Sequence, residues 1–291
     1  MMRRMRAGAW LLLIASTVAS TVVDRRATAV PPLTTTPDGL LIVAADFHVH
    51  GFLGDGALPP WDLAREAQRR DLDVIAVTNH NQNYAVRIHR ALFSPPSHPI
   101  VIPGIEVTTP EYHLAALGVA QPIDWRLSLP DAIRAIQAQG GLAIGAHPVT
   151  RFWERVDDEA IALLDGLEVA HPVGSDKDWR ADLDRLYARA KRIKPTIAAI
   201  GSSDYHFGAP MGAWRTRVLV QELSVAGVFE AIRSGRTVAY DPEGRVFGEQ
   251  KWIEAVAAAG ARRTTQADPG TQHAAMAGAW LALALLLLFR E

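Results

Sequence analysis

The stretch Asp46-Phe47-His48-Val49-His50 lies at the end of an apolar run and is soon followed by Asp55-Gly56. On a β-strand, successive side chains point to opposite faces, so His48 and His50 point to the same side. Two imidazoles at adjacent positions on one face can bind a single metal ion. The stretch therefore predicts a strand that ends in a metal site.

The same arrangement recurs further along the chain. Four more apolar, strand-like runs end in Asn79-His80, in Glu106, in His147-Pro148 and in the segment 201–206. A single histidine is more often a satisfied core or surface residue, but five strand ends with one pattern favour a shared site. Because the active site of an α/β barrel lies where the carboxyl ends of its strands meet, we expect these side chains to converge there.

The order and spacing of these residues resemble the signature of the PHP (polymerase and histidinol phosphatase) domain. That signature is an H-x-H with a following Asp, then a D-H, a lone Glu, one or two further histidines and a late D-x-H. The match runs from residue 45 to residue 240, and segments 76–81 and 234–240 resemble the carbaryl-hydrolase-like branch. The matched residues are His48, His50, Asp55, His80, Glu106, His113, His147, Asp204 and His206.

The resemblance implies an α/β fold, a PHP-type distorted (β/α)7 barrel; the composition of the chain adds apolar N- and C-terminal segments outside it. It also implies two or three divalent metal ions, either zinc, manganese or iron. Glu106 would bridge two of the metals. The implied ligand sets are His48, His50, Glu106 and Asp204 for one metal, Glu106, His113 and His147 for a second, and Asp55, His80 and His206 for a third.

One position departs from the family pattern. The chain has Asn79 where the family usually has Asp before the second-motif histidine. If that Asp orients the imidazole of His80 or takes a proton, an amide keeps the hydrogen bond and loses the charge, so the basicity of the ligand falls. The departure makes activity less certain than metal binding.

A metal-dependent hydrolase is the leading functional hypothesis. A divalent metal lowers the pKa of a bound water toward about 7 and stabilises developing charge, so no serine or cysteine nucleophile is required. We expect a phosphoesterase that acts on a small phosphorylated molecule, with a carboxyl or carbamate esterase and a catalytically silent metal-binding module as alternatives. We expect Glu106, Asp204 and His206 to be catalytic, and Arg151 and Arg236 to bind the substrate phosphate.

Composition excludes several other classes of protein. The chain has 291 residues, of which 49% are hydrophobic and 21% charged, enough for one large core. A net charge of -1, without a basic stripe, gives no reason to expect nucleic acid. The absence of cysteine excludes disulfides and zinc–thiolate sites, so any metal site consists of imidazoles and carboxylates.

The two ends of the chain differ from its middle. Residues 1–26 carry three arginines before an uncharged run at 7–23, which is typical of a signal peptide or of a short uncleaved anchor. We expect a linker at 27–40, the PHP metallohydrolase domain at 41–261, a polar linker at 262–273 and a C-terminal transmembrane segment at 274–289. The arginines then favour an extracytoplasmic, periplasmic-side domain that is exported or tied to the membrane.

Alternating strand-like and helix-like segments fill the middle of the chain. The expected helices are 60–70, 85–92, 129–139, 157–164, 178–192 and 224–234, with Ser128 as a cap of the third. The sequence at 146–149 is echoed at 170–173. This echo places His171 and Glu168 beside the metal site, although we interpret His171 as a strand-end residue that hydrogen-bonds a loop and leave it out of the ligand set.

Overall fold

The computed structural model describes residues 7–16, 18, 32–84, 87, 98–153, 156–206, 210–260, 277–279, 281–282 and 284–287. The chain divides into two compact units. One comprises Met1–Pro31 with Arg263–Glu291, and the other is Pro32–Arg262. The domain boundaries expected from the sequence stay a prediction.

The larger unit is built on one mixed sheet of 11 strands, ordered β11-β10-β9-β2-β3-β4-β5-β6-β7-β8, with β1 beside β2. Strands β8 and β10 also lie against each other, which nearly closes the sheet into a barrel. The fold is therefore the mixed α/β barrel that the sequence predicts. The strands are β1 (Thr34–Thr35), β2 (Leu41–Val49), β3 (Val74–Val77), β4 (Ile100–Thr108), β5 (His113–Leu117), β6 (Leu142–Gly145), β7 (Gly166–Ala170), β8 (Ala198–Gly201), β9 (Arg215–Val220), β10 (Thr237–Tyr240) and β11 (Val246–Gly248).

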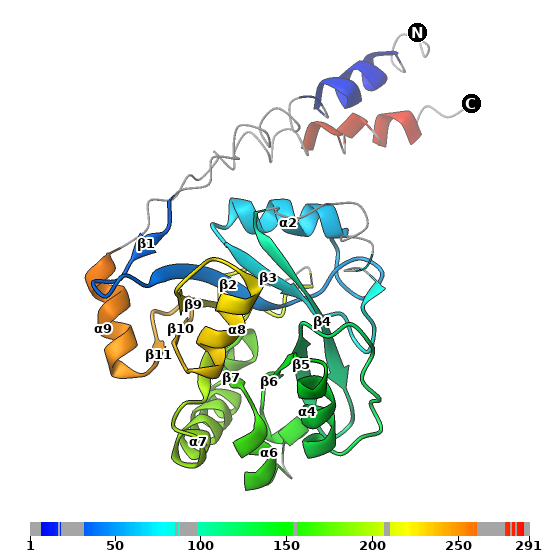
Figure 1. Cartoon of the computed structure of the whole chain (residues 1–291). Coiled ribbons are helices and arrows are strands. Elements are labelled where there is room, and N and C mark those ends of the chain that lie inside the picture. The colour runs from blue at the N-terminus through cyan, green and yellow to red at the C-terminus, as the bar shows by residue number, and fades with distance from the viewer. Residues whose placement is uncertain are drawn as a thin grey trace. The chain divides into compact units, whose positions relative to one another are not determined.

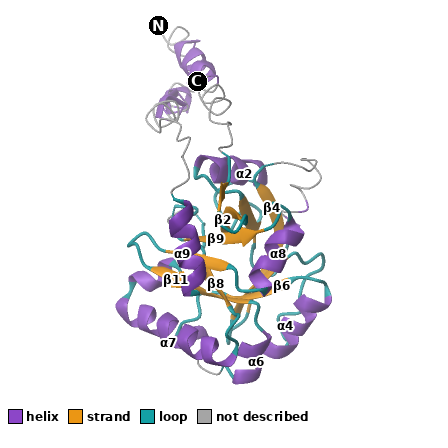
Figure 2. Ribbon diagram, turned by 60° about the vertical axis from the view of Figure 1, so that its left-hand side comes forward, coloured by secondary structure: helices purple, strands orange, loops and turns teal. Residues whose placement is uncertain are grey.

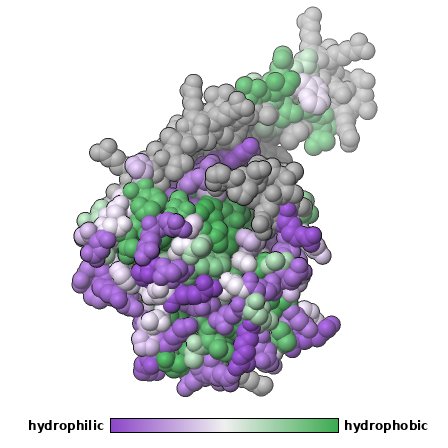
Figure 3. All heavy atoms as spheres, in the orientation of Figure 1, coloured by the Kyte–Doolittle hydropathy of each residue, from purple (hydrophilic) through white to green (hydrophobic). Residues whose placement is uncertain are grey.

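Helices enclose the strands, as Figures 1 and 2 show. They are α2 (Pro60–Arg69), α4 (Leu129–Ala138), α5 (Thr150–Trp153), α6 (Asp158–Leu163), α7 (Lys177–Ile193), α8 (Val225–Arg233) and α9 (Gln250–Ala259), with a 3₁₀ turn, η1 (Pro172–Ser175). The bounds of α2, α4, α6, α7 and α8 agree within one residue with those expected. The helix expected at 85–92 falls almost wholly outside the described residues. Hydrophilic side chains cover most of the face of this unit that Figure 3 shows.

Local sequence explains where α4 begins and ends. The Ser128 hydroxyl accepts a hydrogen bond from the Asp131 amide, 3.3 Å away, as an N-cap does. The helix stops before Gly140, which takes a positive φ of 78° that glycine adopts without a steric penalty. The predicted cap is confirmed, and Gly140 marks the end of the helix.

The direction of β5 positions the site. Strands β2, β3 and β4 are mutually parallel, as are β6, β7 and β8, but β5 runs antiparallel to both β4 and β6. The start of β5 therefore lies at the end of the barrel where the parallel strands finish, and His113 pairs with Thr108 there. We call this end, with the carboxyl ends of β2, β3, β4, β6, β7 and β8, the upper end.

Apolar side chains from around the sheet form the barrel core. Phe47, Ile102, Leu117, Ile144 and Ile200 are fully buried and belong to one cluster with residues of α8. Burying such side chains stabilises the fold by about 1.5–3 kcal/mol each. The opposite, lower end of the barrel is thus closed by a packed helix, and the upper end holds the polar groups.

The terminal segments are helical where the structure describes them, at 7–16, 277–279, 281–282 and 284–287. Among the described residues, no helix has both the length and the apolar character needed to span a bilayer. Much of the expected linkers at 27–40 and 262–273, and parts of both apolar runs, lie outside the described residues. A signal peptide, a membrane anchor and an extracytoplasmic location stay predictions.

Candidate metal centre

The paired histidines at the end of β2, His48 in the strand and His50 just after it, are the centre of the site. His48 and His50 are completely buried, and their Nε2 atoms are 3.0 Å apart. The segment after β8 runs along β2, because the His50 amide donates to the Tyr205 carbonyl at 2.8 Å. This pairing brings Asp204 and His206 beside the two histidines.

Four side chains form the first group of possible ligands. The His48 Nε2 and His50 Nε2 atoms each lie 3.3 Å from Glu106 Oε2 and 3.3 Å from Asp204 Oδ1. A tetrahedral zinc ion with bonds of about 2.0–2.1 Å keeps neighbouring ligand atoms about 3.3 Å apart. Asp204 Oδ1 is buried against the imidazole nitrogens of His48 and His50, and a cation between these atoms would balance its charge. The donor set therefore fits a divalent metal.

Glu106 extends the site toward a second group. Its side chain is 1% exposed, and its Oε1 atom lies 2.8 Å from His113 Nδ1 and 3.0 Å from His147 Nε2. Because its Oε2 atom belongs to the first group, one carboxylate faces both. This geometry is what a bridging ligand requires.

The third group surrounds Asp55. Asp55 Oδ1 lies 2.9 Å from His50 Nδ1, and Asp55 Oδ2 lies 3.2 Å from His80 Nε2 and 3.0 Å from His206 Nε2. The side chains of Asp55 and His80 are 46% and 38% exposed, in contrast to the buried first group. The third group is therefore the side of the site that faces solvent.

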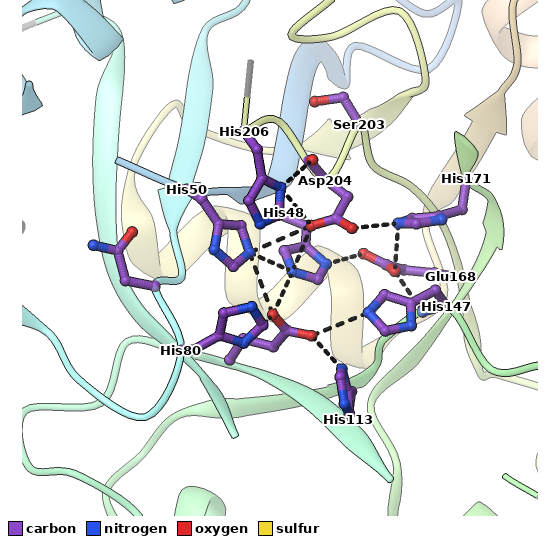
Figure 4. Close-up of polar contacts among 12 residues, drawn as sticks. His48, His50, His80, His113, His147, Glu168, His171, Ser203, Asp204 and His206 are labelled. Carbon is purple, nitrogen blue, oxygen red and sulfur yellow. Dashed lines mark hydrogen bonds and ion pairs between the residues drawn. The ribbon is translucent and has the colours of Figure 1, made fainter. Parts of the chain in front are cut away.

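Figure 4 shows how these side chains converge, with His48 at the centre and His113 and His147 directed at one carboxylate. All nine residues expected from the sequence as ligands come together at the upper end of the barrel. They fall into three adjoining groups, with His50 shared by the first and third. Their role as ligands stays a prediction, and so do the catalytic roles of Glu106, Asp204 and His206.

Mutual attraction sets the charge states of the metal-free site. Burial alone would raise the pKa of Glu106, but His48 and hydrogen bonds from His113 and His147 hold that pKa well below its ordinary value. Burial lowers the pKa of His50, yet hydrogen bonds to Asp204 and Glu106 raise it to about 9. Without metal, protons on the imidazoles balance the buried carboxylates.

Asn79 does not orient His80. The His80 Nδ1 atom lies 2.5 Å from Thr108 Oγ1 and 2.9 Å from Glu106 Oε2, so its partners are on β4. Asn79 Oδ1 instead accepts from the Gly51 amide at 2.7 Å, and its Nδ2 donates to the Gly51 carbonyl at 3.2 Å. The amide therefore holds the loop that carries Asp55, and an aspartate could make only the first of these bonds.

Two residues that the sequence places beside the site, Glu168 and His171, contact it directly. Glu168 is completely buried in the middle of β7, with Oε1 3.0 Å from His48 Nδ1. His171 Nδ1 accepts from the Val173 amide at 3.1 Å, as expected for a histidine that hydrogen-bonds a loop. Its Nε2 atom lies 3.6 Å from Asp204 Oδ2.

The two arginines expected to bind phosphate are not both at this end. Arg236 precedes β10, which is antiparallel to β9 and hence parallel to β2, so Arg236 lies at the lower end. Its guanidinium donates to the Leu219 carbonyl and to Glu230 of α8. The structure does not bring Arg236 to the cluster. Arg151 lies on α5, four residues after His147, with its side chain exposed.

The chain resembles known proteins in sequence and in fold. No family model matches the chain. An uncharacterized protein of Methanocaldococcus jannaschii is 30% identical over 137 residues, which cover 43% of this chain and 80% of that protein. A crystal structure from Bacteroides vulgatus, of a two-domain protein containing a predicted PHP-like metal-dependent phosphoesterase, superposes with a TM-score of 0.61 at 20% identity. That match covers 77% of this chain and 71% of the other.

Proposed function

Because this chain belongs to the same family as the archaeal protein and has the PHP-like fold, we propose that it is a metal-dependent hydrolase, most specifically a phosphoesterase. The observation that carries the proposal is the first group of ligands. Its two imidazole nitrogens each lie 3.3 Å from Glu106 Oε2 and from Asp204 Oδ1, the separation expected around a tetrahedral zinc ion, and Asp204 Oδ1 is buried. Zinc, manganese and iron all suit such a set of imidazoles and carboxylates.

The bound metals would supply a water with a pKa near about 7 and would stabilise negative charge that develops on the substrate. The side chains of the protein would position these metals. Glu106 holds the first and second groups together through its two oxygens. Its carboxylate stays ionised, because neighbouring imidazoles keep its pKa well below the ordinary value in spite of burial.

The direction of substrate entry follows from exposure. His48, His50 and Glu106 are buried, whereas the side chains of Asp55, His80 and His206 are 46%, 38% and 26% exposed. A substrate therefore reaches the metals from the side of the third group. Of the two arginines, Arg151 is retained as a candidate for phosphate binding, since it follows the loop of His147 at the upper end.

Hydrolysis of two model substrates tests the proposal. The purified full-length chain should release nitrophenol from an aryl phosphate, lose this activity with a chelator, and regain it with manganese or zinc. Release from an aryl acetate or carbamate instead would favour the esterase alternative. Metal binding without turnover of either substrate would favour the alternative of a catalytically silent metal-binding module and would contradict the proposed reaction.

A further inference from the structure

Glu168 contacts two different groups of the candidate metal centre. Its Oε1 atom lies 3.0 Å from His48 Nδ1, in the first group. Its Oε2 atom accepts a hydrogen bond of 2.7 Å from the backbone amide of His147, in the second group. The carboxylate is completely buried, so it has no solvent to replace either partner. Both bonds appear in Figure 4 around the centre of the site.

The contact with His48 determines which nitrogen faces the other ligands. Glu168 is an acceptor, so in the neutral ring that binds a metal the His48 Nδ1 atom carries the proton and the Nε2 atom keeps its lone pair. That Nε2 atom is the one 3.3 Å from Glu106 and Asp204. A carboxylate behind a ligating imidazole fixes the orientation and tautomer of the ring and raises its basicity.

The contact with His147 holds a strained turn. His147 has a φ of 27°, outside the regions that non-glycine residues readily adopt. Such a conformation is unfavourable and persists only where surrounding bonds enforce it. The bond from its amide to Glu168 keeps the His147 Nε2 atom 3.0 Å from Glu106 Oε1.

His171 completes this arrangement as a donor. Because its Nδ1 atom accepts from the Val173 amide, the proton of the neutral ring is on Nε2. That buried nitrogen has no hydrogen-bond partner and lies 3.7 Å from Glu168 Oε2 and 3.6 Å from Asp204 Oδ2. His48, Glu168 and His171 are close enough to suggest a metal site of their own, but a protonated Nε2 cannot be a ligand.

We propose that Glu168 is a positioning residue that holds His48 and His147 in place for metal binding and so sets the metal affinity of the first two groups together. The proposal rests on the metal-binding part of the proposed function and not on the reaction catalysed. The role depends on the length of the Glu168 side chain, which lets its two oxygens contact His48 and His147, and not only on its negative charge.

Two variants separate reach from charge. Glu168→Gln keeps the shape and replaces one acceptor by a donor, which then faces the His48 Nδ1 proton or the His147 amide. Glu168→Asp keeps the charge and is one methylene shorter, so it cannot meet both partners. We expect each to weaken metal binding by about 10–100-fold, measured by competition with a chelator on the full-length chain. An affinity of Glu168→Asp equal to wild type would overturn the requirement for reach.

Asp165 provides the matched control. It is a buried carboxylate next to the start of β7, three residues before Glu168 of the same strand. Its Oδ2 atom accepts from the Ala143 amide at 2.9 Å, far along the strand from the metal groups. Asp165→Asn should change metal affinity by less than about twofold, since it contacts no candidate ligand.

Nuclear magnetic resonance of the zinc-loaded wild type gives a readout that needs no variant to fold. The account predicts that His48 binds zinc through Nε2 and carries a strongly hydrogen-bonded proton on Nδ1. Coordination of His48 through Nδ1, or of any metal by His171, would overturn the proposal. Intact metal binding without hydrolysis would refute the proposed reaction alone.

Discussion

The two ends of the barrel use buried carboxylates in different ways. At the lower end, Asp165 precedes β7, and its Oδ2 atom accepts from the backbone amide of Ala143, a residue in the preceding parallel strand. At the upper end, Glu106 and Asp204 meet imidazoles instead. A backbone amide is a permanent partner, whereas an imidazole can be neutral, protonated or bound to metal. For Asp165, Glu106 and Asp204, the partners therefore distinguish a structural acid from a candidate functional one.

The largest difference should follow removal of an upper-end acid. Asp204→Ala takes one ligand atom from the first group and should lower metal affinity and hydrolysis together by at least about 100-fold, more than loss of an outer partner. Metal content by elemental analysis and rates on an aryl phosphate measure both. Full metal content in Asp204→Ala would show that this upper-end acid is not a metal ligand.

The ends should also respond differently to pH. In the metal-free chain, hydrogen bonds to Asp204 and Glu106 overcome burial and raise the pKa of His50 from 6.5 to about 9. Protonated His50 therefore contributes stability that is complete below pH 6.5 and is lost as the pH rises through 9. We expect the chelated chain to lose a few kcal/mol of unfolding free energy over this interval.

Metal should reverse this dependence. Ligating imidazoles must be unprotonated, so the metal-loaded chain is favoured by rising pH and loses metal as the pH falls. Chemical denaturation at several pH values, with and without chelator, measures how the free energy of unfolding changes with pH in each state. If the free energy of unfolding changed with pH in the same way in both states, metal binding at the upper end would not displace protons from the imidazoles.

A lower-end acid should affect stability alone. Asp165→Ala leaves the buried Ala143 amide without its acceptor and should lower the free energy of unfolding by about 1–3 kcal/mol. Metal content of the folded protein should stay at the wild-type value. A folded Asp165→Ala chain that lacks metal would mean that the ends are not independent.

Asn79 tests what a carboxylate does when it is added to the upper end. Asn79→Asp can accept from the Gly51 amide but places a buried oxygen against the Gly51 carbonyl, which now receives a bond from Nδ2. We expect a loss of about 1–2 kcal/mol in stability, with activity kept if the loop of Asp55 stays closed. A marked gain in hydrolysis would show instead that the family's aspartate acts in the chemistry.

The smallest effect should come from Arg236. Its partner Glu230 is 53% exposed, and such pairs contribute about 0–1 kcal/mol. Arg236→Ala should therefore leave both KM and kcat on an aryl phosphate unchanged and lower stability only slightly. A raised KM would indicate that Arg236 does contact the substrate.

The outcome for individual residues shows what the sequence could and could not predict. His48, His50 and His147 follow apolar runs, and the rule that strand ends share a rim was sufficient to bring them together. His113 begins a strand, and it reaches the same rim only because β5 runs antiparallel. Its place came from the family resemblance, since strand direction is not visible in local pattern.

Arg236 and Glu168 illustrate the limits in opposite directions. The turn before β10 was expected near the substrate, but the directions of β9 and β10 put it at the lower end. The repeat at 146–149 and 170–173 did indicate that Glu168 and His171 stand beside the metals. What it could not indicate is that one carboxylate contacts both His48 and His147, because that depends on the packing of β7 between β6 and β8.

Elemental analysis of the purified full-length chain tests the central claim most directly, because the carboxylates and imidazoles of the upper end are held to be metal ligands. The account predicts two or three divalent metals per chain, removed by chelator and restored on addition of zinc or manganese. A folded chain that binds no divalent metal under any of these conditions would contradict it.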